Sequence, residues 1–180
     1  MSNRMKLVLL AFLALVWSAP ALAQTMPASG FRTALIKQID AEANKLISLA
    51  EAIPAEKYSW RPAEGVRSIG EVVAHVAGAN YFLPTFVGAE VPSGINPREF
   101  EQAGTNKDLS VQRLKDSVAH MRATVGGIQD ADLERAVQMF GNETTYQGAL
   151  LLAAGHISEH LGQLIAYARM NGITPPWSQN

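Results

Sequence analysis

Apolar residues recur at intervals of three and four positions in four long segments of the chain, the spacing that gathers side chains on one face of an α-helix. The segments run from Gly30 to Ile53, from Ser68 to Phe82, from Ser110 to Val125 and from Thr145 to Asn171. No stretch combines sustained alternation with enrichment in β-branched residues, so the pattern predicts no strand. We therefore expect an all-α fold in which four helices surround one core.

The connections between the predicted helices differ in length. The loop from Pro54 to Arg67 is short and favours antiparallel neighbours. The Ser68-Ile69-Gly70-Glu71 stretch after it has the pattern of a capping box. The connection from Pro84 to Leu109 is about 26 residues long and rich in Pro, Gly and Asn, which is enough to cross the bundle and let the second and third helices run parallel. A connection of this length in a compact domain is often functional, as a lid or as the wall of a pocket.

The first 23 residues have the three parts of a secretory signal peptide. Residues 1–6 carry positive charge, Leu7 to Trp17 is an uninterrupted run of 11 apolar residues, and Ala21-Leu22-Ala23 is a small-x-small cleavage site. The run is shorter than the roughly 20 apolar residues that span a bilayer. We expect cleavage after Ala23 and a periplasmic or secreted domain of residues 24–180, with no stable membrane association once the signal is removed.

Charge and cysteine content narrow the classes of function. Removal of residues 1–23 leaves 13 basic against 16 acidic residues, a formal net charge of −3. This balance argues against nucleic acid as a partner, because phosphate binding needs clustered Lys and Arg. The chain has no cysteine, which excludes thiolate metal sites, cysteine nucleophiles and disulfides.

The candidate site is His156-Ile157-Ser158-Glu159-His160. Histidines four positions apart on a helix lie one turn apart on the same side, so both rings can bind one ion. The alternative is a pair of surface histidines that bind nothing. The pair lies beside the core stripe, however, and partly buried rings cost stability unless each finds a partner. His75, in the second predicted helix, is the leading candidate for a third ligand; alternatively it is a core histidine bonded to a carbonyl or to Glu71. Three neutral imidazoles leave a coordination position open, which is typical of catalytic ions.

Several other residues are candidates for roles around the histidines. Glu71 lies one turn before His75 and could fix its tautomer, although it is also the reciprocal residue of the capping box. Glu159, Glu71 and Gln163 are the candidates for proton handling or for orienting the ligands. We expect His120 to be exposed.

His-x-x-Glu-His also matches the inverted zinc-peptidase signature, in which Glu159 would be the general base. That class needs a carboxylate ligand downstream, and no Asp or Glu follows Glu159. A peptidase is therefore a minor alternative.

Two further groups of residues have open interpretations. Trp60 and Arg61 either form a wall of the site, with Arg61 orienting an anionic substrate, or they pack and pair on the surface. A stripe of small residues on the last helix favours close helix contact within the bundle, with a homodimer interface as the alternative; the stripe consists of Gly148, Gly155, Gly162 and Ala166.

Several stretches of the sequence resemble the DinB-like (YfiT-like) metalloproteins. The stretches are Tyr58–Pro62, Gly65–His75, His156–His160, Gly162-Gln163-Leu164, Tyr167-Ala168-Arg169 and Pro175-Pro176-Trp177. The resemblance implies an up-down-down-up four-helix bundle with a long crossover between helices two and three. It also implies a His75–His156–His160 triad that binds a divalent ion, zinc or nickel.

The function that the resemblance implies is metal-dependent chemistry on a small molecule. Relatives with known activity use a low-molecular-weight thiol as cosubstrate, but such thiols are concentrated in the cytosol, so export weakens the inference to a thiol transferase. The two hypotheses left open are an exported transferase or hydrolase and a non-catalytic bundle that binds a metal or small ligand in a stress response.

Overall fold

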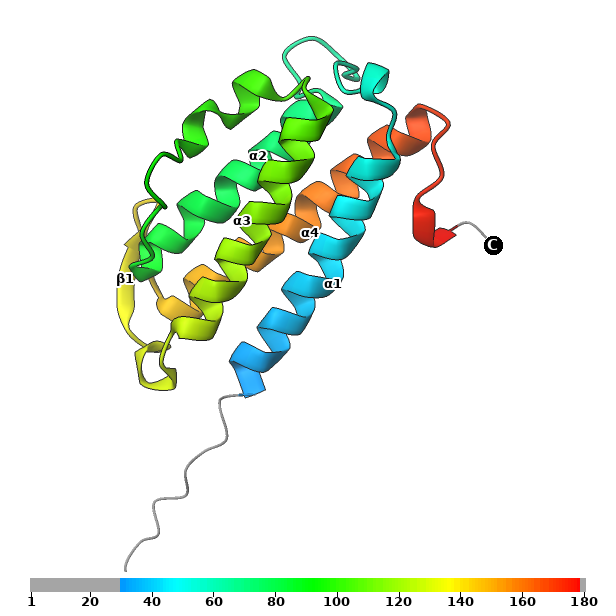
Figure 1. Cartoon of the computed structure of the whole chain (residues 1–180). Helices are drawn as coiled ribbons and strands as arrows, with labels where there is room; N and C mark the ends of the chain where they lie inside the picture. The colour runs from blue at the N-terminus through cyan, green and yellow to red at the C-terminus, as the bar shows by residue number, and fades with distance from the viewer. Residues whose placement is uncertain (1–29, 179–180) are drawn as a thin grey trace, which may run out of the picture.

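Four long helices pack side by side in the computed structural model, which describes residues 30–178 (Figure 1). The expected signal peptide lies outside the described residues. The helices are α1 (Gly30–Ala52), α2 (Ile69–Phe82), α3 (Lys107–Gly127) and α4 (Tyr146–Met170). The described residues also form five short 3-10 helices and one hairpin: η1 (Ala55–Lys57), η2 (Leu83–Val87), η3 (Pro97–Ala103), η4 (Asp130–Asp132), η5 (Pro176–Ser178), β1 (Ala136–Met139) and β2 (Asn142–Thr145). Helix η5 follows α4, and the other elements lie in the connections between the long helices.

Polar side chains set the starts of two helices. The capping box is confirmed: the Glu71 amide donates to Ser68 Oγ at 3.2 Å, and the Ser68 amide donates to Glu71 Oε2 at 2.7 Å. The third helix begins earlier than the apolar pattern predicts, at Lys107, because Asn106 accepts a hydrogen bond from the Leu109 amide at 3.1 Å and caps it. Caps of this kind carry no apolar periodicity, so the pattern alone places the helix start too late.

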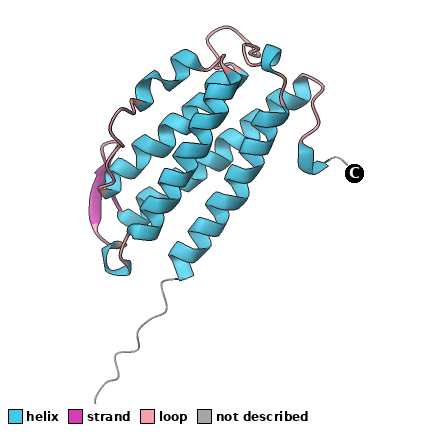
Figure 2. Ribbon diagram, in the orientation of Figure 1, coloured by secondary structure: helices cyan, strands magenta, loops and turns pink. Residues whose placement is uncertain are grey.

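A small antiparallel hairpin interrupts the helical fold, so the all-α expectation is wrong at this point (Figure 2). Strands β1 and β2 are four residues each and pair from Ala136↔Thr145 to Met139↔Asn142, with Phe140 and Gly141 as the two-residue turn. Of the eight strand residues only Met139 is buried. Strands so short and exposed contain too little alternation to be detected from sequence.

Helices α2 and α3 run in the same direction. At the start of α2, Gly70 lies so close to Gly104 that a Cβ on Gly70 would overlap the Gly104 carbonyl oxygen. Near the other end of α2, Asn80 Nδ2 donates to Ser117 Oγ at 3.1 Å, well inside α3. The connection of residues 83–106, called the crossover below, returns along the outside of α2 to make this arrangement possible (Figure 1).

Three members of the small-residue stripe on α4 make no helix contact within the bundle. Gly155, Gly162 and Ala166 are exposed, and a Cβ on either glycine would meet nothing. The expectation of close packing at this stripe is therefore wrong for these three positions. Among the described helices, none combines the length and the apolarity that crossing a membrane requires.

Candidate metal centre

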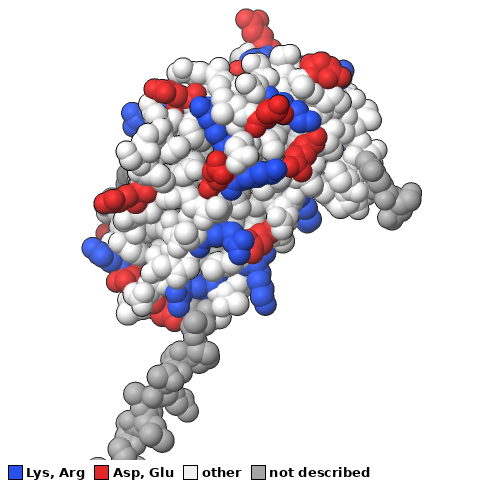
Figure 3. All heavy atoms as spheres, viewed as in Figure 1, with Lys and Arg blue, Asp and Glu red and all other residues white. Residues whose placement is uncertain are grey.

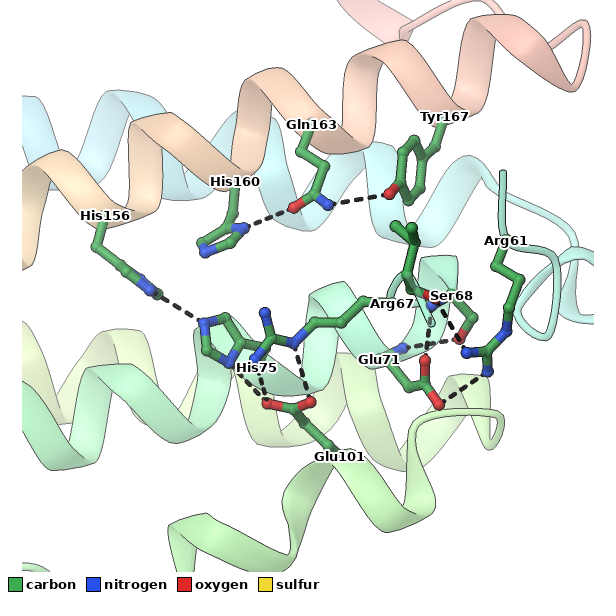
Figure 4. Close-up of polar contacts among 11 residues, drawn as sticks. Arg61, Arg67, Ser68, Glu71, His75, Glu101, His156, His160, Gln163 and Tyr167 are labelled. Carbon is green, nitrogen blue, oxygen red and sulfur yellow. Dashed lines mark hydrogen bonds and ion pairs between the residues drawn. The ribbon is translucent and has the colours of Figure 1, made fainter. Parts of the chain in front are cut away.

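Three histidines from two facing helices point toward one another (Figure 4). His75 lies in the middle of α2, and His156 and His160 lie one turn apart in α4. One ring nitrogen from each residue lies within 4.8 Å of the other two, and the ring centroids are 4.4 to 5.0 Å apart. The structure thus brings together the three residues that the sequence singled out.

Hydrogen bonds behind the rings set the tautomers of two of the histidines. His75 Nδ1 lies 2.7 Å from Glu101 Oε1, and an ionised carboxylate only accepts, so Nδ1 carries the proton. His160 Nδ1 lies 2.7 Å from Gln163 Oε1, and Gln163 Nε2 donates in turn to the Tyr167 hydroxyl at 3.0 Å. Both histidines therefore keep the lone pair of Nε2 for a ligand, which is the usual arrangement of metal-binding imidazoles.

Glu101 takes the role that the sequence suggested for Glu71. The Glu71 carboxylate accepts from the Ser68 amide and from Arg61 Nη2 at 3.0 Å, and it makes no hydrogen bond to His75. Glu101 lies in η3, on the crossover, and Arg67 holds it with two hydrogen bonds of 2.9 and 3.2 Å. Only an indirect signal in the sequence points to Glu101, namely that it lies in the long connection expected to form a wall of a pocket.

Burial lowers the pKa of two of the three histidines, His75 and His156. It lowers the pKa of His156 to about 4, and proximity to His160 and His75 contributes to that shift. Burial also lowers the pKa of His75, although the hydrogen bond to Glu101 opposes the effect. Burial would raise the pKa of the Glu101 carboxyl, but the hydrogen bonds from Arg67 and His75 outweigh it and lower that pKa below its ordinary value. Neutral imidazoles are the form that binds a metal.

The three rings fit a divalent cation. His156 Nε2 faces His75 Nε2 at 3.2 Å, and His156 Nδ1 is buried without a hydrogen-bond partner among the described residues. Ring nitrogens that share one zinc ion at its usual bond length lie no more than about 4 Å apart, which is close to the separations of up to 4.8 Å found in the triad. A set of nitrogen donors alone suits zinc or nickel better than calcium or magnesium, which prefer oxygen.

The other predicted residues lie at different distances from the triad. Gln163 is directly behind His160, whereas Glu159 is exposed and makes no hydrogen bond or ion pair with the described part of the chain. The Trp60 ring packs edge-on against Tyr167 with centroids 5.5 Å apart. The expectation that His120 is exposed is wrong: its ring is partly buried, 4.9 Å from the ring of Tyr81.

A pocket of about 530 Å³ opens beside the triad. His75, His156 and Glu101 contribute to its wall, and the rest of the lining is largely apolar. The crossover supplies part of this wall, as its length predicted. The pocket gives a small molecule direct access to the side of the triad formed by His75 and His156.

Comparisons with known proteins identify relatives of the chain and of its fold. A family model described as the DinB superfamily matches residues 38–164. The uncharacterized protein YjoA of Bacillus subtilis (strain 168) is 30% identical over 129 residues, which cover 70% of this chain and 81% of YjoA. The crystal structure of YjoA superimposes with a TM-score of 0.55 at 23% identity, and covers 78% of this chain and 93% of that one.

Two more distant solved structures share the fold. YfiT from Bacillus subtilis, described as a probable metal-dependent hydrolase with an unusual four-helix bundle topology, matches with a TM-score of 0.63 at 15% identity over 84% of this chain and 93% of YfiT. The colibactin self-resistance protein ClbS, solved in complex with a double-stranded DNA, matches with a TM-score of 0.58 at 17% identity over 80% of this chain and 98% of ClbS. At these identities the likeness extends to the fold alone.

Proposed function

Because this chain belongs to the DinB superfamily, we propose that it is a metal-dependent enzyme, a hydrolase or transferase, that acts on a small molecule. His75, His156 and His160 hold the ion, zinc or nickel. The observation that carries the proposal is the convergence of the three rings, with Glu101 and Gln163 fixing two of them so that Nε2 faces the centre. The description of YfiT as a probable metal-dependent hydrolase supports the same class.

The protein residues around the ion have orienting roles. An ion held by His75, His156 and His160 would supply Lewis-acid chemistry: it would lower the pKa of a bound water or thiol, or polarise a carbonyl. Glu101 holds the proton of His75 at Nδ1 and is itself held by Arg67, so the ring keeps one orientation. Gln163 does the same for His160, and the Tyr167 hydroxyl, whose ring packs against Trp60, accepts a hydrogen bond from Gln163.

A small molecule is the substrate class that best suits the site. The pocket volume of about 530 Å³ lies in the usual range for small-ligand sites. On the face seen in Figure 3, Lys and Arg alternate with Asp and Glu, and neither sign forms a broad patch. This pattern and the acidic balance of residues 24–180 support a substrate other than nucleic acid. The DNA in the ClbS structure is a property of that protein.

Export remains part of the proposal and rests on the sequence of residues 1–23. The mature domain of residues 24–180 would then work in the periplasm or outside the cell, where a thiol cosubstrate is scarce. This favours water over a thiol as the group that the ion activates.

Metal analysis of the tag-free mature protein tests the proposal. We expect about one zinc or nickel ion per chain, and we expect His156→Ala and His160→Ala to lose it. His120→Ala is the matched control, because His120 is also partly buried and lies outside the triad. A wild-type protein that neither retains an ion nor gains thermal stability when zinc or nickel is added would exclude the metal site.

A cobalt-substituted protein then separates the two classes of function. Small anions or thiols that change its visible spectrum indicate an open position, as an enzyme requires. A spectrum that none of them changes favours a bundle that only stores or senses the ion.

A further inference from the structure

The pocket beside the triad has two chemically different halves. One half consists of the histidines His75 and His156 together with Glu101, whose charge Arg67 already balances. The other half is apolar and comes from three separate elements: Ala79 and Phe82 of α2, Leu152 of α4, and Phe140 at the tip of the hairpin. Apart from these histidines and Glu101, Arg98 is the one ionisable residue among the described residues of the lining.

Phe140 occupies a backbone conformation that phenylalanine avoids. Its φ is +52° and that of Gly141 is +81°, so both turn residues are left-handed, as a type I′ hairpin turn requires. Glycine, asparagine and aspartate adopt the first of these positions readily, whereas a bulky side chain there costs free energy. Phe140 is also 59% exposed, so core packing does not explain its presence. Unfavourable backbone conformations that persist tend to occur at functional sites.

The Phe140 ring, which lines the pocket, belongs to an aromatic cluster with Phe82 and Phe86. It lies 5.1 Å from the ring of Phe86 and 6.3 Å from that of Phe82, which is itself 40% exposed. Leu152 faces the same space and is 45% exposed. Large apolar side chains are thus left in contact with water on the walls of the cavity that leads to the triad, which is typical of a binding site for an apolar group.

We propose that the substrate carries an aliphatic or aromatic group that binds between Phe140 and Leu152 while its reacting polar end meets His75 and His156, and that Phe140 determines specificity. The inference rests on the proposed function and adds the substrate class to it. The occupant is a small molecule with an apolar group and a polar end, because the apolar walls and the candidate metal ligands line one continuous cavity.

Hydroxamates of increasing chain length test the proposal by calorimetry on the zinc- or nickel-loaded mature protein. The head group binds a metal ion and the tail enters the apolar half. We expect each methylene from acetohydroxamate to octanohydroxamate to tighten binding about threefold to fourfold until the tail fills the cavity. Equal affinity for all tail lengths overturns the apolar site and leaves the metal site intact.

Phe140→Asn separates a binding role from a structural one. Asparagine before glycine is the preferred pair for this turn, so we expect a higher melting temperature together with binding of octanohydroxamate at least about fivefold weaker and unchanged binding of acetohydroxamate. A variant that is less stable, or that binds the long tail as well as the wild type does, contradicts the role assigned to Phe140.

Adjacent leucines of α4 provide a matched pair. Leu152→Ser removes an apolar wall of the pocket, and Leu151→Ser removes a side chain of similar exposure (48% against 45%) that is not part of the lining. We expect only Leu152→Ser to weaken the binding of octanohydroxamate. If instead both Phe140→Asn and Leu152→Ser convert a dimer to a monomer in sedimentation, the face binds a second copy of the chain and the proposal fails.

Loss of the metal site does not prevent the test. If the protein retains no ion, primary alcohols of the same chain lengths replace the hydroxamates. Their binding is then monitored through the NMR chemical shifts of the Gly78 and Ala79 amides. Shifts with octanol but not with ethanol support the apolar site even though the proposed function has failed. No shift with either alcohol overturns both.

Discussion

Removal of the Glu101 carboxylate is the sharpest test of how the triad is organised. Glu101 Oε1 accepts the proton of His75 Nδ1 at 2.7 Å, and Arg67 fixes the carboxylate through two further hydrogen bonds. In Glu101→Ala the His75 ring loses this acceptor and is free to rotate or to adopt the other tautomer. Loss of such a partner typically lowers metal affinity by about 10- to 100-fold.

A second estimate, from the hydrogen bond itself, gives a similar magnitude. A hydrogen bond to a charged group contributes about 1.5 to 3 kcal/mol, which corresponds to a factor of roughly 10 to 150 in an equilibrium constant. The carboxylate is partly exposed, so the lower half of that range is the better expectation. Glu101→Gln keeps an acceptor oxygen but loses the charge, and we expect it to fall between Glu101→Ala and the wild type.

Competition against a chelator of known affinity measures the effect. Arg67→Ala is the control that frees the Glu101 carboxylate without removing the hydrogen-bond acceptor of His75. We expect it to lower metal affinity less than Glu101→Ala does. Equal affinity in Glu101→Ala and the wild type would refute the orienting role, since the ring would then hold its position without the carboxylate. A loss as large in Arg67→Ala as in Glu101→Ala would show that the ion pair, rather than the hydrogen bond to His75, is the important contact.

Three further predictions concern the stability of the helices and connections that hold the site. Glu71→Ala should cost about 1 kcal/mol of unfolding free energy in urea at pH 7 through loss of the capping box. The hydrogen bond from the Ser68 amide, opposed by burial and aided by Arg61, lowers the pKa of Glu71 in the folded state. The stabilisation that ionised Glu71 contributes is therefore complete above the unfolded pKa of about 4.3. The difference in unfolding free energy between the wild type and Glu71→Ala should disappear as the pH falls through the folded pKa. A difference that persists at low pH contradicts this explanation. Gly70→Ala should lower the melting temperature, at a cost of about 1 to 3 kcal/mol, because its Cβ would overlap the backbone of the crossover. The Cβ of Gly155→Ala would meet nothing, so this variant should stabilise α4 by up to about 1 kcal/mol. Similar effects of the two substitutions would contradict the packing described. Tyr58→Phe removes the buried hydrogen bond of 2.7 Å to a main-chain carbonyl of α1 and should cost about 1 to 3 kcal/mol in the same urea assay; an unchanged midpoint would mean that this carbonyl finds another donor.

The parts of the site that could be predicted from sequence are those on regular helices. His156 and His160 are recognisable because a helix turns a spacing of four into proximity, and His75 because it lies on a second amphipathic helix. The capping box at Ser68 is equally local. Each of these predictions needs only a helical repeat and a short stretch of chain.

The parts that could not be predicted depend on contacts between distant segments without a repeat. Glu101 reaches His75 from a short 3-10 helix on the crossover, 26 residues further along the chain, and no periodicity indicates which carboxylate there turns inward. Phe140 lies in a hairpin of two four-residue strands, and its left-handed turn is occupied by a residue that disfavours it. His120 was expected on the surface because its position beside the apolar stripe does not reveal the ring of Tyr81 on the neighbouring helix.

The separation of His75 and His156 by 81 residues also has a consequence for folding kinetics. Neither half of the chain contains the three nitrogen donors, so the ligand set exists only after α4 has docked on α2. An ion that binds this late contact stabilises the native state more than the folding transition state. Zinc or nickel should therefore slow unfolding while leaving the folding rate nearly unchanged, so that an ion held by the triad would stabilise the folded bundle kinetically.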